Sequence, residues 1–355
     1  MTTLPGTTEE VAEPPLKLRS PLDIIDAIPY LLGFEPADSL VAMSLRGKRS
    51  RLGLTARVDL PSADAADSWA GQYAGYLKRD KALRALIVFY PPTGGLSHPS
   101  VRPLADALTQ HLTRVHIEIK EMLCVSDGRW WSLICDNEAC CPSAGTPISR
   151  DRTSVCVAEL TMRGAVALES REALERTLDP VGGFVNLAMS RALPKACVDR
   201  AADFLKRGRV AQVELLETYR MAVNARCAPD GVVAVPLEID QAARMIAALD
   251  DKTVRDVILC GFGGDEGEAL RALLVDLVRH AVPPHHVAPL TTLAWISYLR
   301  GDGGFAGIAV DRALAADPGY LMAQILDQAL RKPMNPEIFR KGLVPLKSLL
   351  SSRSR

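Results

Sequence analysis

The sequence has no net charge, few aromatic residues and no long apolar run. Its 42 Lys and Arg balance 42 Asp and Glu, so no overall field draws the protein toward nucleic acid or an anionic membrane. The longest apolar stretch in the first half, Ala85–Tyr90, is far shorter than the roughly 20 residues that cross a bilayer. A membrane protein is therefore not expected, and 355 residues with 48% apolar content leave room for two globular domains.

Targeting signals and a disulfide framework are also missing. Residues 1–17 have neither the basic start nor the apolar core of a signal peptide, so we expect a disordered tail and a cytoplasmic protein. Eight cysteines in this length do not make the dense framework of a small secreted domain, and a reducing cytosol keeps them as thiols. We interpret four isolated cysteines as small buried hydrophobic residues: Cys156, Cys197, Cys227 and Cys260.

The motifs of several well-defined chemistries are absent. There is no His-Glu-x-x-His zinc helix, no Gly-x-Ser-x-Gly elbow and no Gly-x-Gly-x-x-Gly turn after a strand. The run Gly261–Glu266 lacks the Lys-Ser/Thr pair of a P-loop and follows a helical pattern, so we interpret it as a helix break. The six histidines form no constellation, and no particular reaction is indicated.

Strand and helix patterns interleave from about residue 20 to residue 160. A helix begins after Ser20, and Pro29 is expected to end or kink it. Alternating apolar residues predict two strands joined through Arg46–Arg51, and Ala85–Tyr90 reads as a fully buried central strand. Asp127-Gly128 predicts a second hairpin. Because hairpins are antiparallel and helical crossovers favour parallel neighbours, an α/β domain with a mixed sheet is expected.

The strand signal nearly vanishes beyond Pro194, where apolar residues follow helical spacing. An all-α C-terminal domain is therefore expected. Near its end, Leu293–Pro318 carries small residues seven apart followed by a proline, which resembles the second helix of a tetratricopeptide repeat. The expected organisation is a tail at 1–17, an α/β domain at 18–160, a connecting segment at 161–195 and a helical domain at 196–355, with the tetratricopeptide-like pair at about 290–331.

Several runs together resemble the actinobacterial domain of unknown function 4192 family. They are Ile28–Phe34, Pro36–Val41, Arg57–Pro61 and Cys135–Pro147, with further similarity over Gly164–Leu178 and Leu293–Pro318. The resemblance implies little about activity, since the family is named for having no established function. The abundance of Ala, and of Arg over Lys, fits a high-GC actinobacterial source.

The sharpest chemical feature is a group of three thiols within seven residues, Cys135, Cys140 and Cys141. Thiolates bind zinc, but a closed tetrahedral site needs four ligands. Cys124 is a poor fourth ligand, because hairpin pairing sets it opposite Trp131, on the order of 13 Å from Cys135 at the rise of a strand. Neighbouring cysteines also rarely reach one ion together. A metal site, a redox pair of Cys135 with Cys140, and a structural turn with buried thiols all stay open.

Charged pairs give weaker signals. Arg57 and Asp59 lie two apart on the polar face of a strand, so they can line a cleft or form a structural ion pair. The basic tip Arg46–Arg51 can contact phosphate, but no aromatic residues accompany it and a solvated turn is the simpler interpretation. Nucleic acid is therefore not an expected partner.

Aromatic residues supply the candidate interface. Trp130 and Trp131 point to opposite faces of their strand, so one is expected in the core and the other nearer the surface. Exposed aromatic side chains anchor many protein interfaces. The candidate interface residues are Trp130, Trp131, Trp295 and Tyr298.

These observations favour a non-enzymatic cytoplasmic interaction or regulatory module, whose helical half offers a groove for a protein or peptide partner. No cofactor is expected, apart from zinc at the cysteines. The alternative is an enzyme of unrecognised type with its site near Arg57, Asp59 and the Cys135–Pro147 loop. A polar pocket that gathers these two runs would favour the enzyme, and their separation would count against it.

Overall fold

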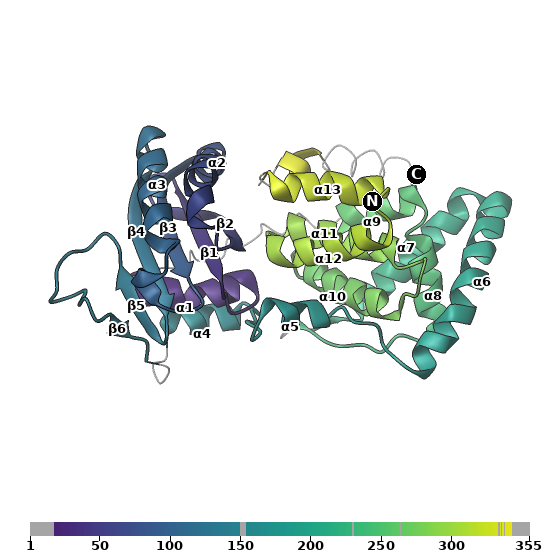
Figure 1. The fold of residues 1–355 in the computed structure, drawn as a ribbon. Helices are drawn as coiled ribbons and strands as arrows, with labels where there is room; N and C mark the ends of the chain where they lie inside the picture. The colour runs from purple at the N-terminus through teal and green to yellow at the C-terminus, as the bar shows by residue number, and fades with distance from the viewer. Residues whose placement is uncertain are drawn as a thin grey trace, which may run out of the picture.

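The computed structural model describes residues 18–342 apart from 150–153, 229–230, 263, 333, 335 and 337. Within these residues, a mixed six-stranded sheet with helices forms the first part of the chain and a helical array forms the rest, as Figure 1 shows. Helix makes up 57% and strand 15%, so helices outweigh the sheet. The predicted fold class, α/β followed by all-α, is confirmed.

Helix α1 (Pro21–Leu32) begins where its capping residues predict. The Ser20 hydroxyl accepts a hydrogen bond from Asp23 N at 3.2 Å, and the Asp23 carboxylate accepts one from Ser20 N at 2.9 Å. The helix ends at Gly33, whose φ of +82° favours glycine. The helix does not end at Pro29, so that part of the expectation of an end or a kink there is wrong. Pro29 is buried, and we attribute the continuation to packing of the helix against the sheet, which offsets the missing N–H.

The first six strands form one sheet in the order β2-β1-β3-β4-β5-β6. Within it, β3 and β4 pair in parallel and the other neighbours pair antiparallel, so the expected mixed sheet is confirmed. Both predicted hairpins are present, and Asp127 and Gly128 adopt φ of +52° and +70° in the second. The strands are β1 (Ser39–Arg46), β2 (Arg51–Asp59), β3 (Ala82–Tyr90), β4 (Glu118–Ser126), β5 (Arg129–Ser132) and β6 (Thr146–Pro147).

Strand β3 is buried on both faces. Ile87 and Phe89 belong to the core beneath α2 (Ala66–Arg79) and α3 (Val101–Arg114). Leu86 and Val88 point the other way, into the core that α1 shares with the sheet. Helix α4 (Val155–Met162) packs beside α1. The sheet therefore lies between two helical layers, and its central strand needs the continuous apolar run that the sequence shows.

The segment that follows joins the sheet to the helical array. Leu168 pairs with Phe34 across a parallel bridge, and α5 (Arg171–Arg176) comes next. Leu174 in α5 packs against the cores of both parts. A second connection is a hydrogen bond of 3.0 Å from the Tyr76 hydroxyl in α2 to the Arg331 carbonyl. The two parts of the chain thus contact each other beyond their covalent link.

The helical array starts before the expected boundary. The predicted domain start at residue 196 falls inside α6, because Pro194 lies within that helix instead of preceding it. The six-stranded sheet does not continue here: β7 (Cys227–Ala228) and β8 (Gly231–Val232) form a separate pair. The helices are α6 (Phe184–Arg207), α7 (Arg209–Asn224), α8 (Ile239–Ala248), α9 (Lys252–Gly261), α10 (Gly264–His280), α11 (Val287–Leu299), α12 (Gly303–Ala316) and α13 (Leu321–Arg331).

A polar network holds the base of the first hairpin. The Asp80 carboxylate, whose side chain is 6% exposed, accepts hydrogen bonds from Arg46 Nε at 2.9 Å and Leu54 N at 3.0 Å, and Ser44 also donates to it. A buried carboxylate needs such partners to remain charged. Arg46 is therefore a structural residue and not a free member of the basic tip.

Gly53 has no side chain, and the hydrogen-bonded groups around Asp80 occupy the space that a side chain would need. A Cβ at Gly53 would lie 2.4 Å from Arg46 Nε and 2.6 Å from Asp80 Oδ2. Because those groups are locked by their hydrogen bonds, we expect Gly53→Ala to lower the free energy of unfolding by roughly 1–3 kcal/mol in chemical denaturation. The matched control is Gly75→Ala in α2, where a Cβ would lie 3.8 Å from Arg79 Nη1, an ordinary contact distance. It should leave stability unchanged or raise it by up to about 1 kcal/mol, and equal losses in both variants would contradict the prediction.

Candidate metal centre

The cysteine loop, residues 133–145 between β5 and β6, is pinned to the outer edge of the sheet. Figure 1 shows it projecting on the side away from the helical array. Trp131 Nε1 donates to the Ser143 carbonyl at 3.1 Å, and Arg129 Nη1 donates to the Gly145 carbonyl at 2.7 Å. Gly145 has φ of +77° and lies so close to the indole that a Cβ would be 2.4 Å from Trp131 Cε2. The loop thus has a defined conformation although it is exposed.

A tight turn at Asn137 brings the thiols together. The Asn137 carbonyl accepts hydrogen bonds from Cys140 N at 3.1 Å and Cys141 N at 2.8 Å. The Asn137 side-chain oxygen accepts another from Ala139 N at 3.0 Å. This short Asx-type turn reverses the chain, and both cysteines face back toward Cys135.

The three sulfur atoms form a compact triangle. Cys135 Sγ and Cys140 Sγ are 3.4 Å apart, Cys140 Sγ and Cys141 Sγ are 3.8 Å apart, and all three lie within 4.8 Å of one another. Bonds of about 2.3 Å to a tetrahedral zinc ion place sulfur atoms about 3.8 Å apart. The sulfur atoms of adjacent Cys140 and Cys141, 3.8 Å apart, are therefore close enough for one ion to contact both.

The thiols differ in how readily they ionise. The backbone N–H of Asn137, and then the neighbouring thiols, lower the pKa of Cys135. Burial, and then the hydrogen bonds with Cys135 and Cys140, raise the pKa of Cys141 to about 12. Cys135 therefore ionises more readily than Cys141, and its negative charge disfavours ionisation of Cys141. A bound cation would remove this repulsion and allow all three thiolates to form.

The other cysteine and tryptophan of the hairpin lie where strand pairing places them. Cys124 pairs with Trp131 as predicted and is fully buried, so it is not a fourth ligand. Trp130 is buried in the core beneath α1. Trp131 is half-buried under the cysteine loop itself. Trp130 is thus the core member of the pair and Trp131 the more exposed one, as strand alternation predicts.

The remaining candidate interface residues are also packed. Trp295 and Tyr298 in α11 are 9% and 4% exposed, and both rings pack edge-on against Phe339. Trp295 Nε1 donates to the Met322 carbonyl at 3.2 Å, and the Tyr298 hydroxyl donates to the Met334 carbonyl at 2.6 Å. These aromatic residues stabilise the end of the helical array instead of forming an exposed surface.

Arg57 and Asp59 lie at the opposite edge of the sheet from the cysteine loop. Arg57 Nη1 lies 2.5 Å from Asp59 Oδ1, while Arg57 Nε donates to Ser39 Oγ at 2.8 Å. Strands β1, β3 and β4 separate β2 from β5, on the order of 19 Å at ordinary strand spacing. The pair fastens β2 to the start of β1, and its separation from the cysteine loop counts against the shared site that the enzyme alternative requires.

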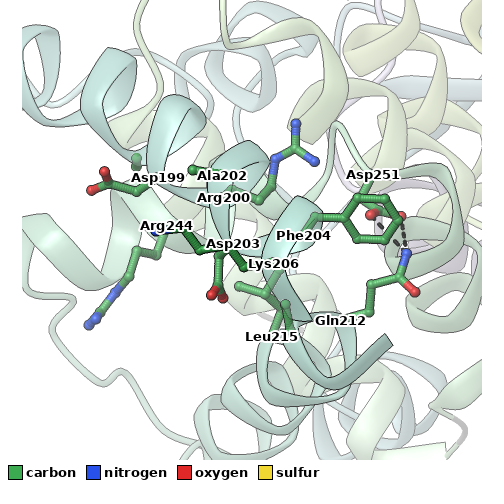
Figure 2. Close-up of a pocket in the computed structure, with 12 residues that line it drawn as sticks. Asp199, Arg200, Ala202, Asp203, Phe204, Lys206, Gln212, Leu215, Arg244 and Asp251 are labelled. Carbon is green, nitrogen blue, oxygen red and sulfur yellow. Dashed lines mark hydrogen bonds between the residues drawn. The ribbon is translucent and has the colours of Figure 1, made fainter. Parts of the chain in front are cut away.

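The structure also assembles features for which the sequence gives no spacing signal. A cavity of about 390 Å³ lies along α6, α7 and α8, and Figure 2 shows its charged lining. Asp251 on its wall accepts two hydrogen bonds from Gln212 Nε2, at 2.9 and 3.1 Å (Figure 2). The other charged lining residues are Asp199, Arg200, Asp203, Lys206 and Arg244. Since three acids face three bases, the cavity favours neither anions nor cations.

A second group of metal-ligand residues, Cys197, Asp250 and His285, also escapes sequence reasoning. Cys197 is interpreted from the sequence as a small hydrophobic residue. Because its partners come 53 and 88 residues later, no local motif marks the group. Only the packing of three separate elements brings these side chains together.

A mixed sheet joined to a helical array, with thiols at the outer sheet edge, defines a two-part α/β and all-α protein. The family model for the domain of unknown function (DUF4192) matches residues 21–337, and the chain belongs to this family. The resemblance to the DUF4192 family seen in the sequence is thereby confirmed. No curated protein and no solved structure matches the chain. Among the described residues, none of the helices is both long and apolar enough for a membrane span. Family membership by itself points neither to an enzyme nor to an interaction role.

Thiol reactivity tests the geometry of the cysteine loop. In the native, metal-free protein we expect iodoacetamide to modify Cys135 at least about tenfold faster than Cys124, because thiolate is the nucleophile. Cys135 has a lowered pKa, whereas burial raises the pKa of Cys124 to about 12. Lowering the pH should slow modification of Cys135 less than that of an ordinary thiol. Peptide mass spectrometry measures both rates, and denatured protein serves as the control in which they should converge. Equal rates in the native protein would disprove the assignment.

Proposed function

We propose that this protein is a non-enzymatic regulatory module that binds a thiophilic metal ion, with zinc as the first candidate, through Cys135, Cys140 and Cys141. The observation that carries the proposal is the mutual distance of the three sulfur atoms, all within 4.8 Å. Thiolates select zinc and monovalent copper over magnesium and calcium. The function supported is sensing or structural switching by an exposed loop, and not catalysis.

The coordination number of the site explains why regulation is the better interpretation. Among the described residues, no other His, Cys, Asp or Glu joins the three thiols in their group. A tetrahedral ion therefore keeps one position for water or for a ligand from a partner. Because the loop projects from the sheet edge, a partner can reach that position without disturbing the core.

Zinc stoichiometry tests the site. Metal-free full-length protein would be titrated with zinc against a chromophoric chelator, together with a variant carrying Cys135→Ser, Cys140→Ser and Cys141→Ser. We expect the variant to bind one equivalent fewer than the wild type, and Cys140→Ser alone to weaken that equivalent at least about tenfold, because each thiolate bond contributes to affinity.

The matched control is Cys227→Ala, which changes an exposed cysteine on β7 outside the group. It should bind as much zinc as the wild type. Equal zinc binding by wild type and triple variant would overturn the metal proposal. If the Cys135–Cys140 peptide were then recovered two hydrogens lighter after mild peroxide treatment, a reversible disulfide would replace it.

A second candidate function is binding of an amphipathic helix from a protein partner along α6. This helix buries one face in the array and exposes another whose residues alternate three and four apart. Phe184 is 81% exposed and Leu205 is 85% exposed, which is unusual for large apolar side chains. The exposed residues at this spacing are Phe184, Leu187, Arg191, Pro194, Val198, Ala201 and Leu205, and α6 also exposes residues outside this stripe. Such heptad spacing is typical of a seam that packs against a second helix.

The end of the helical array supports an interaction module of tetratricopeptide-like type. Ala306, Ala309 and Ala313 on α12 are fully buried, and α12 packs against α11. Small residues at a helix interface allow the close approach that this repeat uses. We propose that α11 and α12 form one such unit in a cytoplasmic protein.

Charge placed on the α6 seam tests partner binding. Proteins captured from native lysate would be quantified for the wild type and for a Val198→Glu/Leu205→Glu variant. We expect specific partners to fall at least about tenfold in the variant, because buried charge without a partner disfavours a helix interface. Val166→Glu, at a position 65% exposed outside α6, is the control and should retain them. Identical capture by all three proteins would contradict the proposal.

A further inference from the structure

Three helical elements bring a thiol, a carboxylate and an imidazole together. Cys197 lies on α6, Asp250 in the turn between α8 and α9, and His285 in the turn between α10 and α11. Cys197 Sγ is 3.6 Å from His285 Nδ1 and 3.9 Å from Asp250 Oδ2. The three potential ligand atoms all lie within 4.8 Å of one another.

Helix ends and turns hold these residues in place. Asp250 N donates to the Ala247 carbonyl at 3.3 Å, in the turn that closes α8. The next residue, Asp251, caps α9 by accepting from Thr253 N at 2.9 Å and Val254 N at 3.2 Å. His285 N donates to the Val282 carbonyl at 2.8 Å. The backbone of each turn is thus fixed by its own hydrogen bonds, which is a requirement for a preformed site.

The distances fit a single zinc ion. Zinc binds cysteine sulfur at about 2.3 Å and histidine nitrogen or carboxylate oxygen at about 2.0–2.2 Å, so tetrahedral ligand atoms lie about 3.4–3.6 Å apart. We infer that Cys197, Asp250 and His285 form a second site for a divalent transition-metal ion, zinc by preference, whose fourth position is open to solvent. The site lies in the helical array and is separate from the cysteine loop.

A cysteine nucleophile is a poorer explanation of the same residues. In a Cys-His-Asp catalytic arrangement, the carboxylate orients the imidazole from the nitrogen remote from the sulfur. Here Asp250 contacts the sulfur itself, where it would repel a thiolate. A cation removes that repulsion and uses the three donor types that zinc accepts.

The surrounding charges also permit a cation. Arg200, one turn further along α6, is a positive charge near Cys197. Burial, and then the neighbouring His285, lower the pKa of His286, which favours its neutral form. Asp250 and an ionised Cys197 outweigh Arg200 by two charges to one. Binding would displace the thiol proton to solvent, which leaves the metal-bound group close to neutral.

Cobalt is the probe for this site, since a cobalt–thiolate bond gives a charge-transfer band in the near ultraviolet. The Cys135→Ser/Cys140→Ser/Cys141→Ser variant serves as the background, so the absorption reports only the helical site and is independent of the proposed loop site. We expect this background to bind one equivalent of cobalt with a thiolate band. Cys197→Ala should abolish the band, while Asp250→Asn and His285→Gln should each weaken binding at least about tenfold.

The matched control is His286→Gln, which alters the adjacent histidine outside the group and should leave cobalt affinity unchanged. A further measurement keeps Cys197 intact and so avoids any effect of the substitutions on folding. In the background variant, zinc should slow iodoacetamide modification of Cys197 at least about tenfold. A background that binds no cobalt, or modification of Cys197 unaffected by zinc, would overturn the inference.

Discussion

The apolar run of β3 requires cover on both of its faces, and the rest of the sheet-bearing part follows from that requirement. Leu86, Ile87, Val88 and Phe89 are each no more than 2% exposed. Burying side chains of this size contributes about 1.5–3 kcal/mol each, as an upper estimate. Helices α2 and α3 cover one face, while α1, with α4 beside it, covers the other. Because β1 and β4 pair with β3 at the centre, β2 and β6 lie at the two edges of the sheet.

The identity of the edges decides where chemistry is possible. Strand β2, at one edge, uses Arg57 and Asp59 to fasten itself to the start of β1. At the other edge, β5 and β6 are short and a loop that leaves the sheet joins them, so this loop can present thiols to solvent. Trp131 and Gly145 hold that loop against the sheet, while Cys140 stays exposed and Cys135 and Cys141 are half-buried. The same architecture separates the two charged or reactive runs that a shared active site would have to combine.

The two candidate metal groups arise in different ways. In the cysteine loop, one Asn137 turn gathers ligands that are close in sequence, and the fold needs only to expose them. In the helical array, the ends of packed helices supply one ligand each, so the group exists only when α6, the turn after α8 and the turn after α10 are assembled. A partner can reach the group in the cysteine loop. The group of Cys197, Asp250 and His285, in contrast, forms only when the helical array is folded.

Local sequence was sufficient for many elements, because capping, turn and alternation signals depend on neighbouring residues. The start of α1 at Ser20, the hairpin at Asp127-Gly128, the buried β3 run and the pairing of Cys124 with Trp131 were all predictable in this way. The cysteine loop was predictable as a candidate, but its three interpretations could not be separated without distances between sulfur atoms.

Tertiary packing decided those features in which contacts with distant parts of the chain override the conformational preference of the local sequence. The helix through Pro29 and the continuation of α6 through Pro194 persist although proline removes a backbone donor. Trp295 is buried because Met322 and Phe339, which follow α12 in the chain, contact its ring. The meeting of Cys197 with His285 has no local cause, because contacts between distant residues are set by how apolar faces pack and not by the spacing of residues along the chain.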